Sequence, residues 1–173
     1  MSGPRSSNVS VVVMGVSGSG KTTIASELAT RWHDVFIEAD DLHSASNIET
    51  MASGHSLNDD DRLPWLRRVG QRIHVEEEMG NRTVTACSAL KRAYRDILRE
   101  YDPDLFFVLL SGPMEFVRQR MKTRHDSFMP DSLLESQYAT LEPLTPDESG
   151  VTVDLSSGRE HIVREIATAL ERD

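Results

Sequence analysis

Cysteine and lysine are both scarce in this sequence of 173 residues. Cys87 is the one cysteine, so no disulfide can form within the chain, which fits a reducing compartment and favours a cytoplasmic protein. Lysine occurs only as Lys21, Lys91 and Lys122, and the formal net charge is −9. Broad nucleic-acid binding needs a basic face, so this balance predicts no nucleic-acid partner. A few local cations would have to hold any anionic substrate.

Long apolar runs are also absent. No stretch of 18 apolar residues is present, which excludes a typical transmembrane helix and predicts no membrane partner. Residues 1–8 are polar and lack the apolar centre of a secretory signal, so they are interpreted as a flexible tail. The remaining residues, 9–173, have the length of one domain.

Short apolar segments alternate with segments of helical spacing along the chain. The segments 9–14, 35–39, 82–87, 105–110 and 150–156 are predicted strands. Predicted helices separate them, and one more closes the chain. This alternation predicts an α/β fold of three layers, with a central five-stranded parallel sheet and helices on both faces. The polar segments 40–61 and 122–132 are predicted inserts within that domain.

A glycine-rich loop follows the first predicted strand. The residues "GVSGSGKT", 15–22, match G-x-x-x-x-G-K-[ST] between a predicted strand and a predicted helix. Its glycines allow backbone N–H groups to approach phosphate oxygens, Lys21 can reach the β- and γ-phosphates, and the Thr22 hydroxyl can ligate Mg²⁺. The predicted ATP site comprises Gly15, Val16, Ser17, Gly18, Ser19, Gly20, Lys21, Thr22 and Thr23.

Acidic residues follow the second predicted strand in the stretch "FIEADDLH". Ligands of open α/β sheets gather at the carboxyl ends of the strands, where Glu38, Asp40 and Asp41 are expected. Asp40 is the first candidate for taking a proton from a hydroxyl acceptor, with Asp41 and Glu38 as alternatives, and Glu38 is a second candidate metal ligand. Alternatively, Asp40 and Asp41 only cap a turn. The Asn-Lys-x-Asp motif of GTPases is absent.

Four motifs together resemble the gluconate kinase family, a relative of the shikimate and nucleoside monophosphate kinases. They are "GVSGSGKT", "EADDLHSASNIETMASGHSLNDDDRLPWL", "ACSALKRAYRDILR" and "SFMPDSLLESQYATLEPL". The resemblance implies a P-loop kinase fold and ATP-dependent phosphorylation of D-gluconate at O6. Because family members are often dimeric, it also implies a homodimer. The chain departs from the family pattern at Ser44, where Pro is common, and at Ser127, where His is usual, with His125 two residues earlier.

The resemblance also implies roles for charged residues outside the glycine loop. In these kinases a cationic lid closes over ATP, here at about 120–132, and Arg120 and Arg124 match its arginines; the alternative is a solvated basic helix face. Asp61 is expected to cap a helix that begins near Arg62, with Pro64 in its first turn. The acceptor's hydroxyls suit aspartates and its carboxylate suits cations. The predicted acceptor-binding residues are Asp40, His43, Asp60, Arg62, Lys91 and Arg95.

Two other functions remain open at the level of sequence. One is a kinase of the same fold that acts on shikimate, a nucleoside monophosphate or another small acceptor. The other is a nucleotide-binding module without catalysis, against which the acids after the second strand argue, because binding alone needs no base.

Overall fold

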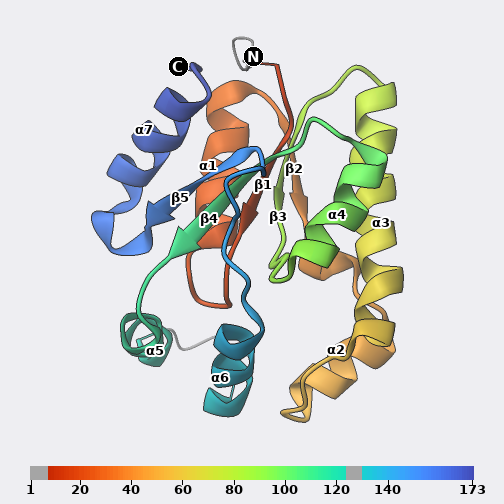
Figure 1. Ribbon diagram of the computed structural model, residues 1–173, viewed down its shortest axis with the longest axis vertical. Coiled ribbons are helices and arrows are strands. Elements are labelled where there is room, and N and C mark those ends of the chain that lie inside the picture. Colours follow the sequence, from red (N-terminus) through yellow and green to blue (C-terminus); the bar gives the residue numbers. More distant parts are fainter. Residues whose placement is uncertain (1–7, 124–129) are drawn as a thin grey trace.

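A five-stranded parallel sheet forms the centre of the protein (Figure 1). The computed structural model describes residues 8–123 and 130–173. The strand order is β2-β3-β1-β4-β5, and every pairing is parallel. The strands are Val11–Met14 (β1), Val35–Glu38 (β2), Thr83–Ala86 (β3), Phe106–Ser111 (β4) and Gly150–Asp154 (β5). The predicted α/β fold with five parallel strands is confirmed.

The central strand β1 is apolar along its whole length because both faces of the sheet are covered. All four of its residues are buried, and Val12 lies between Thr85 of β3 and Phe107 of β4. Val11 and Val13 belong to one hydrophobic core, whereas Val12 and Met14 belong to the other. The continuous β-branched run is therefore the pattern of a strand buried on both sides.

Helices cover both faces of the sheet and complete three layers (Figure 1). On one face, a pair of helices contributes Leu28 and Ile166 to the first hydrophobic core. On the other face, a second pair contributes Trp65 and Leu98 to the second core. The first pair is α1 (Lys21–Trp32) with α7 (Arg159–Ala169), and the second is α3 (Asp59–Glu78) with α4 (Arg92–Tyr101). None of the helices in the described ranges is both long and apolar enough to cross a lipid bilayer.

The short helices gather at the carboxyl edge of the sheet, at the bottom of Figure 1. They are α2 (Ala45–Ala52), α5 (Met114–Lys122) and α6 (Asp131–Thr140), with the 3₁₀ helices η1 (Ala39–Leu42) and η2 (Leu155–Ser157). Because the strands are parallel, the loops after β1, β2 and β3 all emerge at this edge. The glycine-rich loop, Asp40 and Lys91 therefore lie at one edge of the sheet.

The helix α3 begins earlier than the sequence predicts. Asn58 is its N-cap: the Asn58 side chain accepts from the Asp61 N–H at 2.8 Å, and the Asp61 carboxylate accepts from the Asn58 N–H at 3.1 Å. The prediction that Asp61 caps a helix starting near Arg62 is therefore wrong, because this reciprocal pair satisfies two end groups at once. Asp59, Asp60 and Asp61 form the first turn, where acids complement the helix dipole.

Cys87 lies in the interior just after β3. Its residue is 1% exposed, and burial raises the pKa of its thiol to about 12. The thiol therefore stays protonated and behaves as a small apolar side chain.

Candidate active site

The glycine-rich loop joins β1 to α1 and is packed against α5. Gly18 has φ +78°, a left-handed conformation that favours glycine. A Cβ atom at Gly18 would lie 2.7 Å from Cγ of Met121 and 3.2 Å from Cγ1 of Val117, both on α5. Both the backbone conformation and the close packing therefore require glycine at this position.

Several polar groups of this loop have no partner within residues 8–123 and 130–173. Among the described residues, no acceptor receives the N–H of Gly18 or Gly20, and the buried Ser19 hydroxyl has no hydrogen-bond partner. Gly20 is also the N-cap of α1, so the positive end of that helix lies at the loop. Lys21 Nζ donates to Val16 O at 3.0 Å and so lies along the loop. The N–H donors of the loop, the positive end of α1 and the ammonium of Lys21 together fit a phosphate group.

Thr22 and Glu38 lie beside the loop and offer oxygen ligands. The Thr22 hydroxyl donates to Glu38 Oε2 at 2.5 Å, which links α1 to the end of β2. Burial raises the pKa of Glu38, and the Thr22 hydrogen bond opposes that shift. The part of the chain that the structure describes holds no cluster of three metal-ligating side chains. The pair fits Mg²⁺, which is commonly held by one or two protein oxygens together with water and phosphate oxygens.

A cavity of about 300 Å³ adjoins the loop on the side of α5 and α7. Arg120 borders it, donating to Ser19 O at 3.2 Å and to Leu155 O at 3.4 Å, and its guanidinium lies 5.1 Å from the Phe116 ring centroid. The lining residues are Ser19, Gly20, Thr23, Ile24, Arg120, Thr123, Leu155, Arg159 and Ile162. The cavity thus lies where the remainder of a nucleotide would extend from phosphates bound at the loop.

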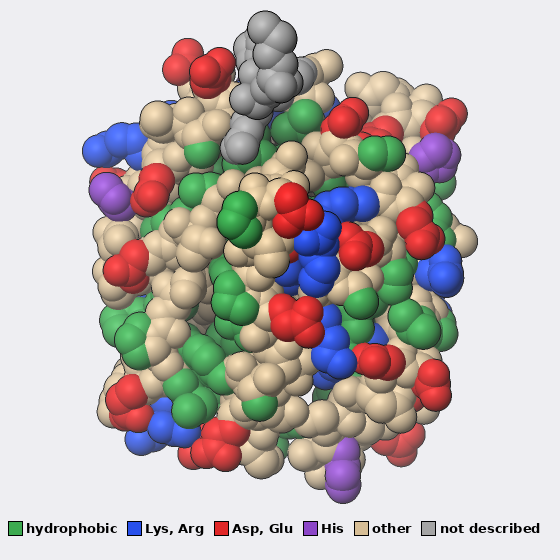
Figure 2. Space-filling view, viewed as in Figure 1, with side chains coloured by type: hydrophobic (Ala, Val, Ile, Leu, Met, Phe, Trp, Pro, Cys, Tyr) green, Lys and Arg blue, Asp and Glu red, His purple; other side chains and the backbone are tan. Residues whose placement is uncertain are grey.

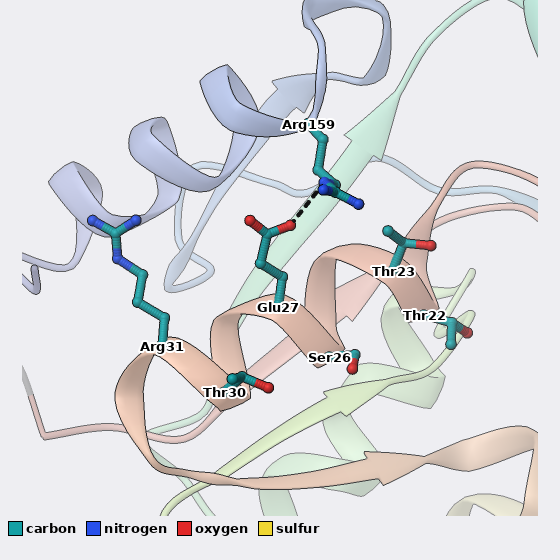
Figure 3. Close-up of a pocket in the computed structure, with 7 residues that line it drawn as sticks. All are labelled: Thr22, Thr23, Ser26, Glu27, Thr30, Arg31 and Arg159. Carbon is teal, nitrogen blue, oxygen red and sulfur yellow. Dashed lines mark ion pairs between the residues drawn. The ribbon is translucent and has the colours of Figure 1, made fainter.

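A second, more open groove of about 670 Å³ runs along the exposed side of α1 (Figure 3). Glu27 of α1 and Arg159 at the start of α7 point toward one another and form an ion pair of 3.0 Å. Thr23 and Arg159 line both this groove and the smaller cavity. The groove therefore begins at the glycine-rich loop, and the ion pair holds Arg159 where the two spaces meet.

The predicted lid is described only in part. Arg124, His125 and Ser127 lie outside the described residues, so the structure says nothing of them. Residues 120–123 end α5 and its cap, and residues 130–132 begin α6. Arg118 pairs with Glu115 at 2.9 Å and is not among the residues that line the cavity beside the loop, whereas Arg120 is.

Asp40 lies on η1, directly after β2, and its side chain is 73% exposed. Glu38, not Asp40, caps η1, because its Oε1 accepts from the Asp40 N–H at 3.3 Å. The His43 ring stacks on Trp65 with 4.0 Å between ring centroids, and its Nε2 lies 3.9 Å from Asp40 Oδ1. Burial lowers the pKa of His43, and its side chain is only 4% exposed. His43 therefore backs Asp40 instead of opening to the site.

Two predicted cations meet across the starts of α3 and α4. Arg62 NH1 donates to the Tyr94 hydroxyl at 2.9 Å, that hydroxyl donates to Asp59 Oδ1 at 2.5 Å, and Lys91 Nζ lies 3.4 Å from the same oxygen. The Tyr94 hydrogen bond lowers the pKa of Asp59. Tyr94 is not among the residues predicted from the sequence, because an aromatic residue at helical spacing is typical of a core position; its place three residues after Lys91 was the available signal. Asp60 is exposed and has no side-chain partner among the described residues.

Arg95 is not placed in the site. Charged side chains of both signs gather over α4 (Figure 2). Arg95, which belongs to this helix, is fully buried and pairs with Glu148 through hydrogen bonds of 2.7 and 2.8 Å, while its NH1 also donates to Ala89 O at 3.0 Å. The prediction that Arg95 contacts an acceptor is wrong for this geometry, because Glu148 already holds its guanidinium.

Comparisons with known proteins agree with this arrangement. The sequence family described as an AAA domain matches residues 11–144. A thermoresistant gluconokinase of Escherichia coli (strain K12) is 42% identical over 153 residues, covering 88% of this chain and 87% of the relative. The crystal structure of a sugar kinase from Janibacter sp. HTCC2649 is 50% identical, covers 94% of each chain and gives a TM-score of 0.91. The crystal structure of a gluconokinase from Sinorhizobium meliloti 1021 is 43% identical in sequence and gives a TM-score of 0.88. The match covers 96% of this chain and 93% of that gluconokinase. The chain therefore belongs to the gluconokinase family.

Proposed function

We propose that this protein transfers the γ-phosphoryl group of ATP to O6 of D-gluconate, giving 6-phospho-D-gluconate and ADP. Relatives named gluconokinase, similar over most of the chain, support the choice of acceptor. The observation that carries the proposal is the meeting of three features at one edge of the sheet. These are the glycine-rich loop, the exposed carboxylate of Asp40, and the cations Arg62 and Lys91.

The nucleotide is proposed to bind along the loop and in the adjoining cavity. The N–H groups of Gly18 and Gly20 and the ammonium of Lys21 would bind its phosphates, and Arg120 would border the rest of the nucleotide. Thr22 and Glu38 would hold Mg²⁺, which when bound shields the negative charge of the β- and γ-phosphates.

The acceptor is proposed to bind between η1 and the starts of α3 and α4. Gluconate carries one carboxylate and five hydroxyl groups, so it needs a cation at one end and acceptors along its length. Arg62 and Lys91 would bind the carboxylate, and the exposed carboxylate of Asp60 can accept from hydroxyls. Asp59 and Tyr94 would hold Arg62 and Lys91 in place, so both are proposed to position these cations.

Phosphoryl transfer needs an oriented hydroxyl and a neutralised phosphate. The Asp40 carboxylate would orient the 6-hydroxyl and accept its proton as the oxygen attacks the γ-phosphorus and the bond to the ADP oxygen breaks. Lys21 would stabilise the charge that develops on the transferred group. Asp40 follows β2 and the loop follows β1, with β3 between these strands, so both lie at the same edge of the sheet and the fold would supply the alignment.

The decisive experiment measures ADP release with ATP, Mg²⁺ and a panel of acceptors: gluconate, glucose, shikimate, glycerate and AMP. We expect gluconate to give the highest kcat/KM. Glucose has a 6-hydroxyl but lacks the carboxylate, so leaving Arg62 and Lys91 without a partner should make it a poor acceptor. Equal kcat/KM for another acceptor would refute the assignment, and ATP binding without acceptor-dependent ADP release would indicate a non-catalytic module.

A further inference from the structure

The motif "SQYATLEPL", residues 136–144, has no part in the function described so far. In the structure it spans the end of α6 and the segment after it. Residues 136–142 contact three different segments of the site: the glycine-rich loop, the connection between α2 and α3, and the loop that carries Lys91. We call residues 136–142 the bridging segment.

The first contact is between Gln137 and the glycine-rich loop. Gln137 Oε1 accepts from the Ser17 N–H at 2.7 Å, and Gln137 Nε2 donates to the Ser17 hydroxyl at 3.2 Å. Ser17 precedes Gly18, whose N–H has no partner among the residues that the structure describes. One side chain of α6 thus fixes both the backbone and the side chain of the residue that leads into the proposed phosphate donors.

The second contact lies one residue earlier on the same helix. The Ser136 and Ser56 hydroxyls are 2.7 Å apart, and Ser56 belongs to the connection between α2 and α3. That connection leads to Asn58, the N-cap of α3, and so to Asp59. The bridging segment therefore reaches the acceptor side of the proposed site as well as its phosphate side.

The third contact surrounds Lys91. The Glu142 N–H donates to Leu90 O at 2.7 Å, and Glu142 Oε1 accepts from the Arg92 N–H at 3.0 Å. Lys91 is the N-cap of α4 but its own side chain makes no capping hydrogen bond. Glu142 therefore supplies the missing cap from outside the helix and fixes the backbone on both sides of Lys91.

The bridging segment is itself anchored to the sheet. The Tyr138 hydroxyl donates to Gly112 O at 2.9 Å, just after β4, and Leu133 and Leu134 on α6 are buried. We propose that the bridging segment sets the distance between the bound nucleotide and the acceptor, with Gln137 and Glu142 as positioning residues. This inference rests on the proposed gluconokinase activity.

The test of Gln137 separates kcat from KM. In Gln137→Ala and in Gln137→Met, which keeps the length of the side chain, the nucleotide and gluconate retain their own contacts, but the loop loses its support. We expect kcat to fall about 10- to 100-fold, as for a small misplacement of reacting groups. KM for each substrate should stay within about threefold of wild type, because ground-state binding is retained. Gln71→Ala, at an exposed position on α3, is the matched control and should leave kcat unchanged.

The test of Glu142 reads out the acceptor. Glu142→Ala should raise KM for gluconate about 3- to 10-fold, the effect of losing one hydrogen bond, while KM for ATP is unchanged. Glu142→Gln retains an oxygen that can accept from the Arg92 N–H and should restore the wild-type KM. Thermal unfolding of each variant would establish that it is folded at the assay temperature.

The outcomes separate this proposal from the proposed function. Wild-type protein that releases no ADP with gluconate contradicts the proposed function. Active wild-type protein together with unchanged kcat in both Gln137 variants overturns the role of Gln137. If KM for gluconate is raised equally in Glu142→Gln and Glu142→Ala, the effect comes from the lost charge. That result would overturn the role of the hydrogen bond.

Discussion

Arg95 and Glu148 form an ion pair of 2.7 Å in which both side chains are fully shielded from solvent. Burial alone would raise the pKa of Glu148, but hydrogen bonds from Arg95 and Arg99 lower this pKa to about 2. In Glu148→Gln the Arg95 charge would remain buried without a counter-charge, so we expect a loss of about 3–5 kcal/mol in the free energy of unfolding, measured by urea denaturation. Asp147→Asn, which alters an exposed partner of Arg92, is the control and should change stability little.

Lys21 should be essential for turnover but not for folding. Its ammonium lies along the glycine-rich loop, 3.0 Å from Val16 O, where it would stabilise the charge that develops as the phosphoryl group moves. We expect Lys21→Ala to lower kcat by roughly 10³-fold with an unchanged melting temperature. Near-normal turnover in this variant would show that the loop is not the phosphate site.

Asp40 and its neighbour Asp41 offer a paired test of the proposed base. Both are exposed and adjacent on η1. Loss of a general base lowers kcat by about 10²–10⁴-fold, which we expect for Asp40→Asn at saturating gluconate. Asp41→Asn should keep most of the activity, and a reversed pattern would assign the role to Asp41.

Tyr94 should tune acceptor binding through Arg62 and Asp59. Tyr94→Phe removes only the hydroxyl that joins these two side chains, so the cation loses its fixed position. We expect KM for gluconate to rise about 10-fold with KM for ATP unchanged, in steady-state assays of ADP release. Tyr101→Phe, in the same helix, is the matched control. Equal KM values for gluconate in both variants would remove Tyr94 from the site.

Glu77 makes stability depend on pH. Burial, followed by a hydrogen bond with Asp102, raises the pKa of Glu77 from 4.5 to about 7. The folded chain therefore binds more protons than the unfolded chain between these values, so stability should fall as pH rises through this window. Glu77→Gln should remove that fall when unfolding is measured at pH 5 and pH 8. Glu78→Gln, at an exposed position, should retain the wild-type dependence.

The fold can be predicted from the sequence because its strongest signals are local. The apolar run from Val11 to Met14 predicts a buried strand, and the glycine loop after it predicts a turn and the start of a helix. Neither prediction needs information from residues far away in the chain. The position of Asp40 at the carboxyl edge follows from its place directly after the second predicted strand, since parallel strands end at the same edge of a sheet.

The contacts that the sequence does not reveal depend on residues far apart in the chain. Arg95 has the same helical spacing from Lys91 as a site residue would have, and only Glu148, 53 positions later, identifies it as structural. The link between Ser17 and Gln137 spans 120 positions. Such pairings arise from tertiary packing, which periodicity does not encode.

The buried thiol of Cys87 makes this protein convenient for spectroscopy. Maleimides react with thiolates, and a thiol with a pKa of about 12 that is 1% exposed offers almost none at neutral pH. Because Cys87 is the one cysteine, a cysteine introduced at the exposed Ser132 of α6 would be the only labelled position in the folded protein. A fluorophore there would report how the start of α6 moves as substrates bind, without a cysteine-free background having to be made first.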